Sequence, residues 1–131
     1  MAGAGVDRAA LGHALANPKD SGVIRFAEPK HRTEWAGLDG RLRMLVWFVG
    51  GFRFVVYGSG VTVTSVSSGT HSTGSKHYSN RAVDLRSRDL AGADKEAFYS
   101  FVRGAAPLIG ASAILEDLNG ANEHLHVQLN V

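Results

Sequence analysis

Side chains that commonly bind metal ions are concentrated in two short segments of this chain. His77 and Asp84 are separated by six residues, and Glu123, His124 and His126 follow together near the end of the sequence. A catalytic zinc ion keeps three nitrogen or oxygen ligands from the protein, and the fourth position is left to a water molecule that becomes the nucleophile. The sequence therefore predicts that His77, Asp84 and His126 bind one Zn²⁺ per chain.

The pattern of the surrounding residues places these side chains on strands. Residues 124–131 alternate between polar and apolar side chains, as in a strand with one buried face and one polar face. His124 and His126 are expected on the polar face, and the leucines and valines between them in the core. Asp84 lies in a second alternating segment, beside Ala82, whose small side chain leaves space for an ion between two neighbouring strands.

The combination Ser-x-His-x6-Asp and Glu-x-x-His resembles zinc peptidases that cut bacterial peptidoglycan stem peptides. These are the D-alanyl-D-alanine dipeptidases and carboxypeptidases and the phage L-alanyl-D-glutamate endopeptidases, which share a fold and zinc site with the hedgehog signalling domain and the lysostaphin-type peptidases. The resemblance has specific motifs over residues 60–131, and it extends to the first half only in general layout. It implies that His77, Asp84 and His126 bind zinc and that Glu123 is the general base.

Three positions depart from the family pattern. Asn80 stands where relatives commonly have glycine, and asparagine is the other residue that best tolerates a left-handed backbone. The stretch 65–68 lacks the arginine with which relatives hold the substrate carbonyl or carboxylate. His124 lies two residues before His126, where related His-x-His peptidases place a catalytic histidine. Glu123 and His124 therefore compete for the role of base.

Three further polar residues are candidates for substrate contact. Ser75 matches the family's serine two positions before the first ligand, although a loop serine needs no special role. Arg81 lies inside the motif and could supply the missing positive charge; the alternative is a surface arginine. His71 lies in a loop rich in serine, threonine and glycine, residues 68–80, that is expected to form the rim of a cleft. The side chain of His71 either contacts the substrate or is exposed to solvent.

Composition sets further limits on function. With 131 residues, 44% of them hydrophobic, the chain suffices for a single domain over residues 1–131 with one core. The net charge is +2, but Lys and Arg form no run of the kind that binds nucleic acid, so no nucleic-acid partner is expected. The absence of cysteine excludes disulfides and thiolate zinc sites.

The sequence also suggests where the protein is made and where it acts. Its first residues lack the basic start and apolar stretch of a secretory signal. The apolar segment 44–57 contains Gly50, Gly51 and Arg53 and is shorter than the ~20 residues of a membrane-spanning helix. Synthesis in the cytoplasm without a signal peptide and no membrane insertion are therefore expected. Action at the bacterial cell wall would then follow release through a phage holin or incorporation into a virion.

Periodicity and turn residues predict the order of the elements. Helices are expected at residues 7–18, 33–49 and 94–106, the second ending at Gly50-Gly51. Strands are expected at 52–57 and 61–67, joined as a hairpin, around Asp84, at 111–118 and at 124–131. This order predicts an α+β domain with a small, mainly antiparallel sheet covered by helices. The resemblance implies the hedgehog/DD-peptidase fold.

Two functions remain open at this level. The first is a zinc peptidase that hydrolyses stem peptides, as a free endolysin or as part of a phage particle. The second is a non-catalytic zinc-containing binding or structural module of the same fold, for example a virion component. The presence of Glu123 favours the peptidase, and the missing arginine leaves room for the module.

Overall fold

Five short strands form one sheet in the part of the chain that the computed structural model describes, residues 22–69 and 71–130. The strands are β1 (Ile24–Phe26), β2 (Val61–Ser65), β3 (Ala82–Arg86), β4 (Ala111–Glu116) and β5 (His124–Leu129). Their order across the sheet is β1-β2-β3-β5-β4, and only the β1–β2 pair is parallel. The predicted α+β class with a mainly antiparallel sheet is confirmed.

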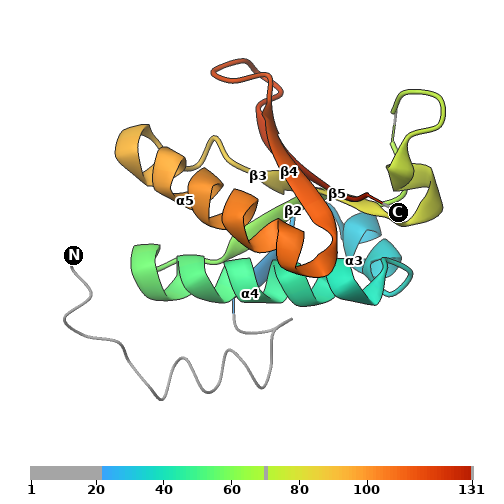
Figure 1. Ribbon diagram of the computed structural model, residues 1–131, viewed down its shortest axis with the longest axis horizontal. Helices are drawn as coiled ribbons and strands as arrows, with labels where there is room; N and C mark the ends of the chain where they lie inside the picture. The colour runs from blue at the N-terminus through green and yellow to red at the C-terminus, as the bar shows by residue number, and fades with distance from the viewer. Residues whose placement is uncertain (1–21, 70, 131) are drawn as a thin grey trace.

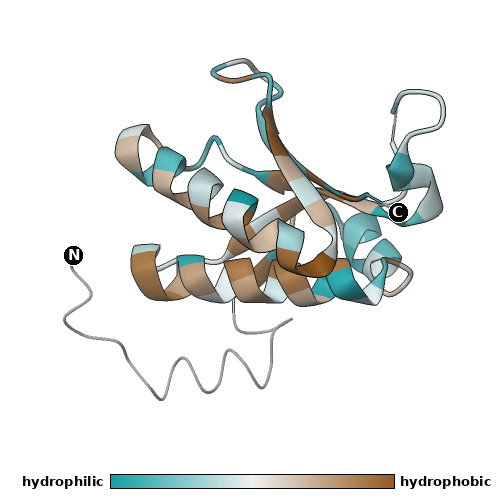
Figure 2. Ribbon diagram, in the orientation of Figure 1, coloured by the Kyte–Doolittle hydropathy of each residue, from teal (hydrophilic) through white to brown (hydrophobic). Residues whose placement is uncertain are grey.

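Three α-helices accompany this sheet among the described residues. They are α3 (Pro29–Trp35), α4 (Gly40–Tyr57) and α5 (Gly92–Ala105), with 3₁₀ turns η2 (Lys76–Ser79) and η3 (Ala106–Ile109). The helices α4 and α5 lie side by side and cover one face of the sheet (Figure 1). The more apolar of the two is α4, as its colouring in Figure 2 shows. No helix in the described ranges has the combination of length and hydropathy that a membrane span requires.

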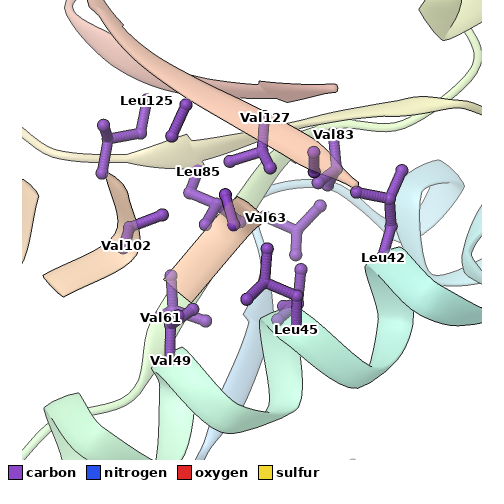
Figure 3. Close-up of a cluster of buried hydrophobic side chains, with 14 of the residues drawn as sticks. Leu42, Leu45, Val49, Val61, Val63, Val83, Leu85, Val102, Leu125 and Val127 are labelled. Carbon is purple, nitrogen blue, oxygen red and sulfur yellow. The ribbon is translucent and has the colours of Figure 1, made fainter. Parts of the chain in front are cut away.

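The core fills the space between these two helices and the sheet. Figure 3 shows side chains from α4, α5 and three strands meeting there: Leu42, Leu45, Val49, Val61, Val63, Val83, Leu85, Val102, Leu125 and Val127. Burying a side chain of this size contributes about 1.5–3 kcal/mol. The alternation of β5 is confirmed, because Leu125, Val127 and Leu129 are buried while His124 and His126 are partly exposed. Those two histidines lie on the face away from α4 and α5, which we term the open face.

The helix expected at residues 33–49 is in fact the end of one helix and most of another. Residues 36–39 separate α3 from α4, and Asp39 caps α4 by accepting a hydrogen bond of 2.9 Å from the backbone N–H of Arg41. The expected stop at Gly50-Gly51 is wrong, because α4 continues to Tyr57 and ends at Gly58, which has a left-handed φ of 81°.

The hairpin expected from 52–57 and 61–67 is also wrong. Residues 52–57 are the last part of α4, and β2 pairs instead with β1 and β3. A short apolar run fits a buried helix as well as a strand, so its period could not decide between them. Long-range contacts favour the helix, since buried Arg53 forms an ion pair of 3.0 Å with Asp89, after β3. The three residues of β1 are too few for a period to be detected.

The remaining elements agree with the expectations from sequence. The helix at 94–106 is α5, and the strands at 111–118 and 124–131 are β4 and β5. Asn80 has the left-handed conformation expected of it, with φ 61°. The helix expected at residues 7–18 lies outside the described residues.

Gly50 and Gly51 form a matched pair for a stability test. A Cβ atom at Gly50 would lie 2.6 Å from the carbonyl oxygen of Val23, whereas one at Gly51 would meet nothing within 4 Å. We expect Gly51→Ala to raise the free energy of unfolding by about 0.5–1 kcal/mol, because alanine restricts the unfolded chain. Gly50→Ala should lower the free energy of unfolding by about 1–3 kcal/mol, because the backbone of Val23 or of α4 must move to make room for the methyl group. Urea denaturation measures both, and equal stabilities would contradict the close approach of Val23.

Candidate metal centre

Three side chains from separate elements meet on the open face. Strands β3 and β5 are neighbours with Asp84 opposite His126, and the turn η2 brings His77 to the same place. The Nε2 atom of His77 lies 3.1 Å from Oδ1 of Asp84 and 3.3 Å from Nδ1 of His126, and that Nδ1 lies 3.0 Å from the same Oδ1. The structure therefore brings together the three residues that the sequence predicted as ligands.

The outer nitrogens of both imidazoles are held by acceptors. Nδ1 of His77 lies 2.7 Å from the carbonyl oxygen of Val66, and Nε2 of His126 lies 2.9 Å from Oε1 of Gln128. Because these oxygens only accept, each outer nitrogen carries the hydrogen, and each inner nitrogen of a neutral ring has its lone pair. Such outer partners are usual for histidines that bind metals. When both rings are neutral, two lone pairs and a carboxylate face one another, and either a proton on an inner nitrogen or a metal ion stabilises this arrangement.

The spacing of the three donor atoms fits a metal ion. Ligands at 2.0–2.1 Å from zinc in a tetrahedron lie about 3.3 Å from one another, close to the separations of His77, Asp84 and His126. Among the residues that the structure describes, two overlapping groups could hold an ion: one includes His71 with His77 and Asp84, and the other includes Glu116 with Asp84 and His126. Asp84 belongs to both groups, so a metal ion bound by either group would have Asp84 as a ligand.

The electrostatics of Asp84 favour a bound cation. Burial would raise the pKa of this carboxyl, but hydrogen bonds from His126 and His77 outweigh burial and hold the pKa well below its usual range. In turn the hydrogen bond to Asp84 raises the pKa of His126, against the effect of burial. Protons therefore compete with a metal ion for His126, and we expect metal affinity to fall as the solution becomes acidic.

Glu123 faces a different set of partners. Its carboxylate accepts hydrogen bonds from Nζ of Lys95 at 2.7 Å, from Oγ of Ser87 at 2.7 Å and from the backbone N–H of Asn119 at 3.0 Å. Its side chain is only 1% exposed. Glu123 belongs to neither group of possible ligands. None of these contacts joins Glu123 to His77, Asp84 or His126, and its role as base stays a prediction.

The pKa of Glu123 leads to a test of stability against pH. Burial would raise this pKa, but the hydrogen bonds from Lys95, Asn119 and Ser87 together lower it to about 2. The folded pKa is below the unfolded value of about 4.3, so this stabilisation is present above that value and is lost as the pH falls toward 2. We expect the free energy of unfolding to decrease less over this interval in Glu123→Gln than in the wild type.

Denaturant titrations at a series of pH values would measure this difference. The exposed residue Glu96 provides the control, and Glu96→Gln should follow the wild-type curve. Identical curves for Glu123→Gln and the wild type would contradict the hydrogen-bonding role assigned to Glu123.

His124 lies beside the three converging side chains. Its Nδ1 atom is 2.7 Å from the carbonyl oxygen of Asn122, and its Nε2 atom is 3.0 Å from Oε1 of Glu116 and 3.6 Å from Oδ2 of Asp84. Glu116 is directly opposite His124 in the β4–β5 register. No spacing signal indicated Glu116, because only the pairing of β4 with β5 brings it to the site.

The three predicted substrate-contact residues have different surroundings. Ser75 lines the cavity next to the site, and its Oγ accepts a hydrogen bond of 3.2 Å from the backbone N–H of His77. His71 also lines the cavity, and its ring stacks on that of His77 with centroids 3.9 Å apart. Arg81 is exposed and does not line this cavity. The structure therefore brings Ser75 and His71 to the site, but not Arg81.

The cavity lies on the open face, between the loop of residues 68–80 and the turn that joins β4 to β5. Its volume is about 1410 Å³, and its lining includes His77, Asp84, His124 and His126. This volume exceeds the ~300–1,000 Å³ typical of small-molecule pockets. The function must be inferred from this site, because no model of a known protein family and no curated protein sequence matches the chain.

Proposed function

We propose that this protein is a zinc-dependent peptidase of the hedgehog/DD-peptidase fold that hydrolyses peptide bonds in bacterial peptidoglycan stem peptides. The observation that carries the proposal is the convergence of His77, Asp84 and His126 within 3.3 Å of one another, with both outer imidazole nitrogens already held. Their sequence pattern resembles that of D-Ala-D-Ala carboxypeptidases and L-Ala-D-Glu endopeptidases. One zinc ion per chain would be held by these three residues.

The site chemistry divides between the ion and nearby side chains. Zinc, when bound, polarises a carbonyl group and lowers the pKa of a water molecule to about 7. His124 is the side chain best placed to move the proton: Asn122 holds its Nδ1–H, and its Nε2, beside Glu116, is an acid when protonated and a base once that proton has left. General acid–base help of this kind is typically worth about 10²–10⁴ in rate.

Glu123 has a supporting role in this proposal. A carboxylate with three hydrogen-bond donors and a pKa of about 2 is a weak base near neutral pH. Its contacts with Lys95 and Ser87 instead tie the start of β5 to α5 and to the end of β3. By holding the chain just before His124, Glu123 keeps that histidine and His126 in register.

The protein would act at the cell wall. As an endolysin it would reach peptidoglycan after a holin opens the inner membrane, and as a virion component it would arrive with the particle. His71 and Ser75 would line the path of the stem peptide, since both line the cavity beside His77.

One observation favours a second candidate function. Glu123, the base that the resemblance implies, is hydrogen-bonded to Lys95, Ser87 and Asn119 and belongs to neither group of possible ligands. If His124 does not replace it, the protein is a non-catalytic zinc-containing module of the same fold, such as a structural part of a virion.

Digestion of purified peptidoglycan decides between these two functions. The zinc-loaded protein should release fragments whose new amino or carboxyl termini identify the cut bond by mass spectrometry. Chelator-treated protein and Asp84→Ala provide inactive controls. A folded protein with one zinc per chain that produces no new termini would exclude the peptidase and leave the non-catalytic module.

A further inference from the structure

Arg86 lies close to the candidate metal centre. It is the last residue of β3, two positions after Asp84, and it is directly opposite His124 in β5. Residues two apart on a strand point to the same face and lie about 6.5 Å apart along it. Arg86 therefore rises from the open face beside His124, and it lines the same cavity.

Among the described residues, the side chain of Arg86 has no hydrogen bond or ion pair, and this distinguishes it from the other cations that line the cavity. Lys30 lies 3.5 Å from Glu28, Lys76 donates to the carbonyl oxygen of Leu129, and Arg88 donates to that of Ala121 at 2.9 Å. The charge of Arg86, which is partly buried, is left without a partner.

The carboxylates that line the cavity have other partners. Glu116 accepts from His124 at 3.0 Å, Glu123 from Lys95 at 2.7 Å, and Asp84 lies within 3.1 Å of two histidines. Glu28 pairs with Lys30, and Asp117 accepts from the backbone N–H of Asn122 at 3.0 Å. A guanidinium in a partly buried position is stabilised by an anion. The open position beside Arg86 can be filled by an anion that the ligand brings.

We propose that Arg86 binds a carboxylate group of the ligand, on the side of the metal centre where His124 lies. The planar fork of arginine donates two parallel hydrogen bonds to a carboxylate, a geometry that lysine cannot reproduce. This inference rests on the proposed function for the nature of the ligand, a stem peptide. Such a peptide offers two carboxylates next to the bonds in question: its C-terminus, and the α-carboxylate of a γ-linked D-glutamate.

Binding of four peptides to the zinc-loaded protein tests this inference. In each peptide a ketomethylene group replaces the scissile amide, so that binding is measured by calorimetry without turnover. One pair ends in D-Ala-D-Ala with a free or an amidated C-terminus; the other contains L-Ala-γ-D-Glu with a free or an amidated α-carboxylate. We expect the wild type to bind the free carboxylate of one pair about 10- to 100-fold more tightly than its amide, which identifies the carboxylate that Arg86 recognises.

Two substitutions at Arg86 and one control complete the experiment. Arg86→Gln should remove the preference for the carboxylate, and Arg86→Lys should keep part of it, with zinc content unchanged in both. Arg103→Gln removes the same charge from an exposed position on α5 and should keep the full preference. The inference is overturned if Arg86→Gln keeps the wild-type preference, or if the wild type prefers neither carboxylate.

These outcomes are separate from the test of the proposed function. Peptidoglycan digestion asks whether a bond is cut, whereas the ketomethylene peptides ask only which group is bound. A protein that shows the Arg86-dependent preference but cuts no bond would retain the carboxylate site and lose the peptidase assignment. A protein that cuts bonds without that preference would retain the peptidase assignment and lose the role of Arg86.

Discussion

His126→Ala is expected to abolish stoichiometric zinc binding while the fold remains intact. The Nδ1 atom of His126 lies 3.0 Å from Asp84 and 3.3 Å from His77, so its removal leaves two of the three predicted ligands. The loss of zinc affinity should exceed the 10- to 100-fold typical when an outer hydrogen-bond partner of a ligand is removed. Metal analysis after dialysis and competition with a chromogenic chelator measure both stoichiometry and affinity.

Neighbouring residues supply graded controls for this prediction. Gln128→Ala removes the acceptor that holds the outer nitrogen of His126, and it should weaken zinc binding by about 10- to 100-fold. His124→Ala changes the same face of β5 but should retain one zinc per chain. His71→Ala distinguishes the two possible groups of ligands, and it too should retain zinc.

Two results would contradict this assignment. Full stoichiometric zinc in a folded His126→Ala protein would remove His126 from the centre. A loss of zinc in His71→Ala as complete as in His126→Ala would move the centre toward the group formed by His71, His77 and Asp84.

His124→Ala is expected to lower hydrolysis by about 10²–10⁴, the usual contribution of general acid–base catalysis. Glu123→Gln should lower the rate per folded molecule less, because its carboxylate already accepts from Lys95, Ser87 and Asn119. Its larger effect should be on stability, since the change leaves the ammonium group of Lys95 without its ion pair. Initial rates on peptidoglycan fragments, normalised to folded zinc-loaded protein, compare the two variants directly.

Glu116→Gln refines this comparison. Glu116 contacts the Nε2 atom of His124 at 3.0 Å, so its removal should lower kcat and shift the pH profile of the reaction while zinc is retained. If Glu123→Gln lowers the hydrolysis rate more than His124→Ala does, Glu123 is the base, as the resemblance implies. Negligible effects of both would support the non-catalytic module.

Local pattern alone determined a large part of the second half of this protein. The alternation in β5 predicted which side chains are buried, and the spacing around Asp84 predicted its strand, because a strand's period of two is visible over a few residues. A helical period predicted α5, and the family pattern, with asparagine in the place of glycine, indicated the left-handed backbone of Asn80. The residue types at positions 77, 84 and 126 predicted a shared site, and the register of β3 with β5 together with the turn η2 brings these three side chains together.

Tertiary contacts decided what local pattern could not. The helix α4 continues past Gly50, where the carbonyl oxygen of Val23 leaves no space for a side chain. The orientation of Glu123 depends on its hydrogen bond with Lys95, which is 28 positions away in the chain. Neither contact leaves a periodic signal in sequence.

The surroundings of the candidate centre were decided in the same way. Glu116 reaches His124 because β4 pairs with β5 in this register. In the part of the chain that the structure describes, the carboxylates that line the cavity have partners other than Arg86. The residue types thus specify which chemistry is available, since ligand preferences are properties of single side chains. Which of those side chains face one another is specified by packing, because it depends on distances between segments that are far apart in the chain.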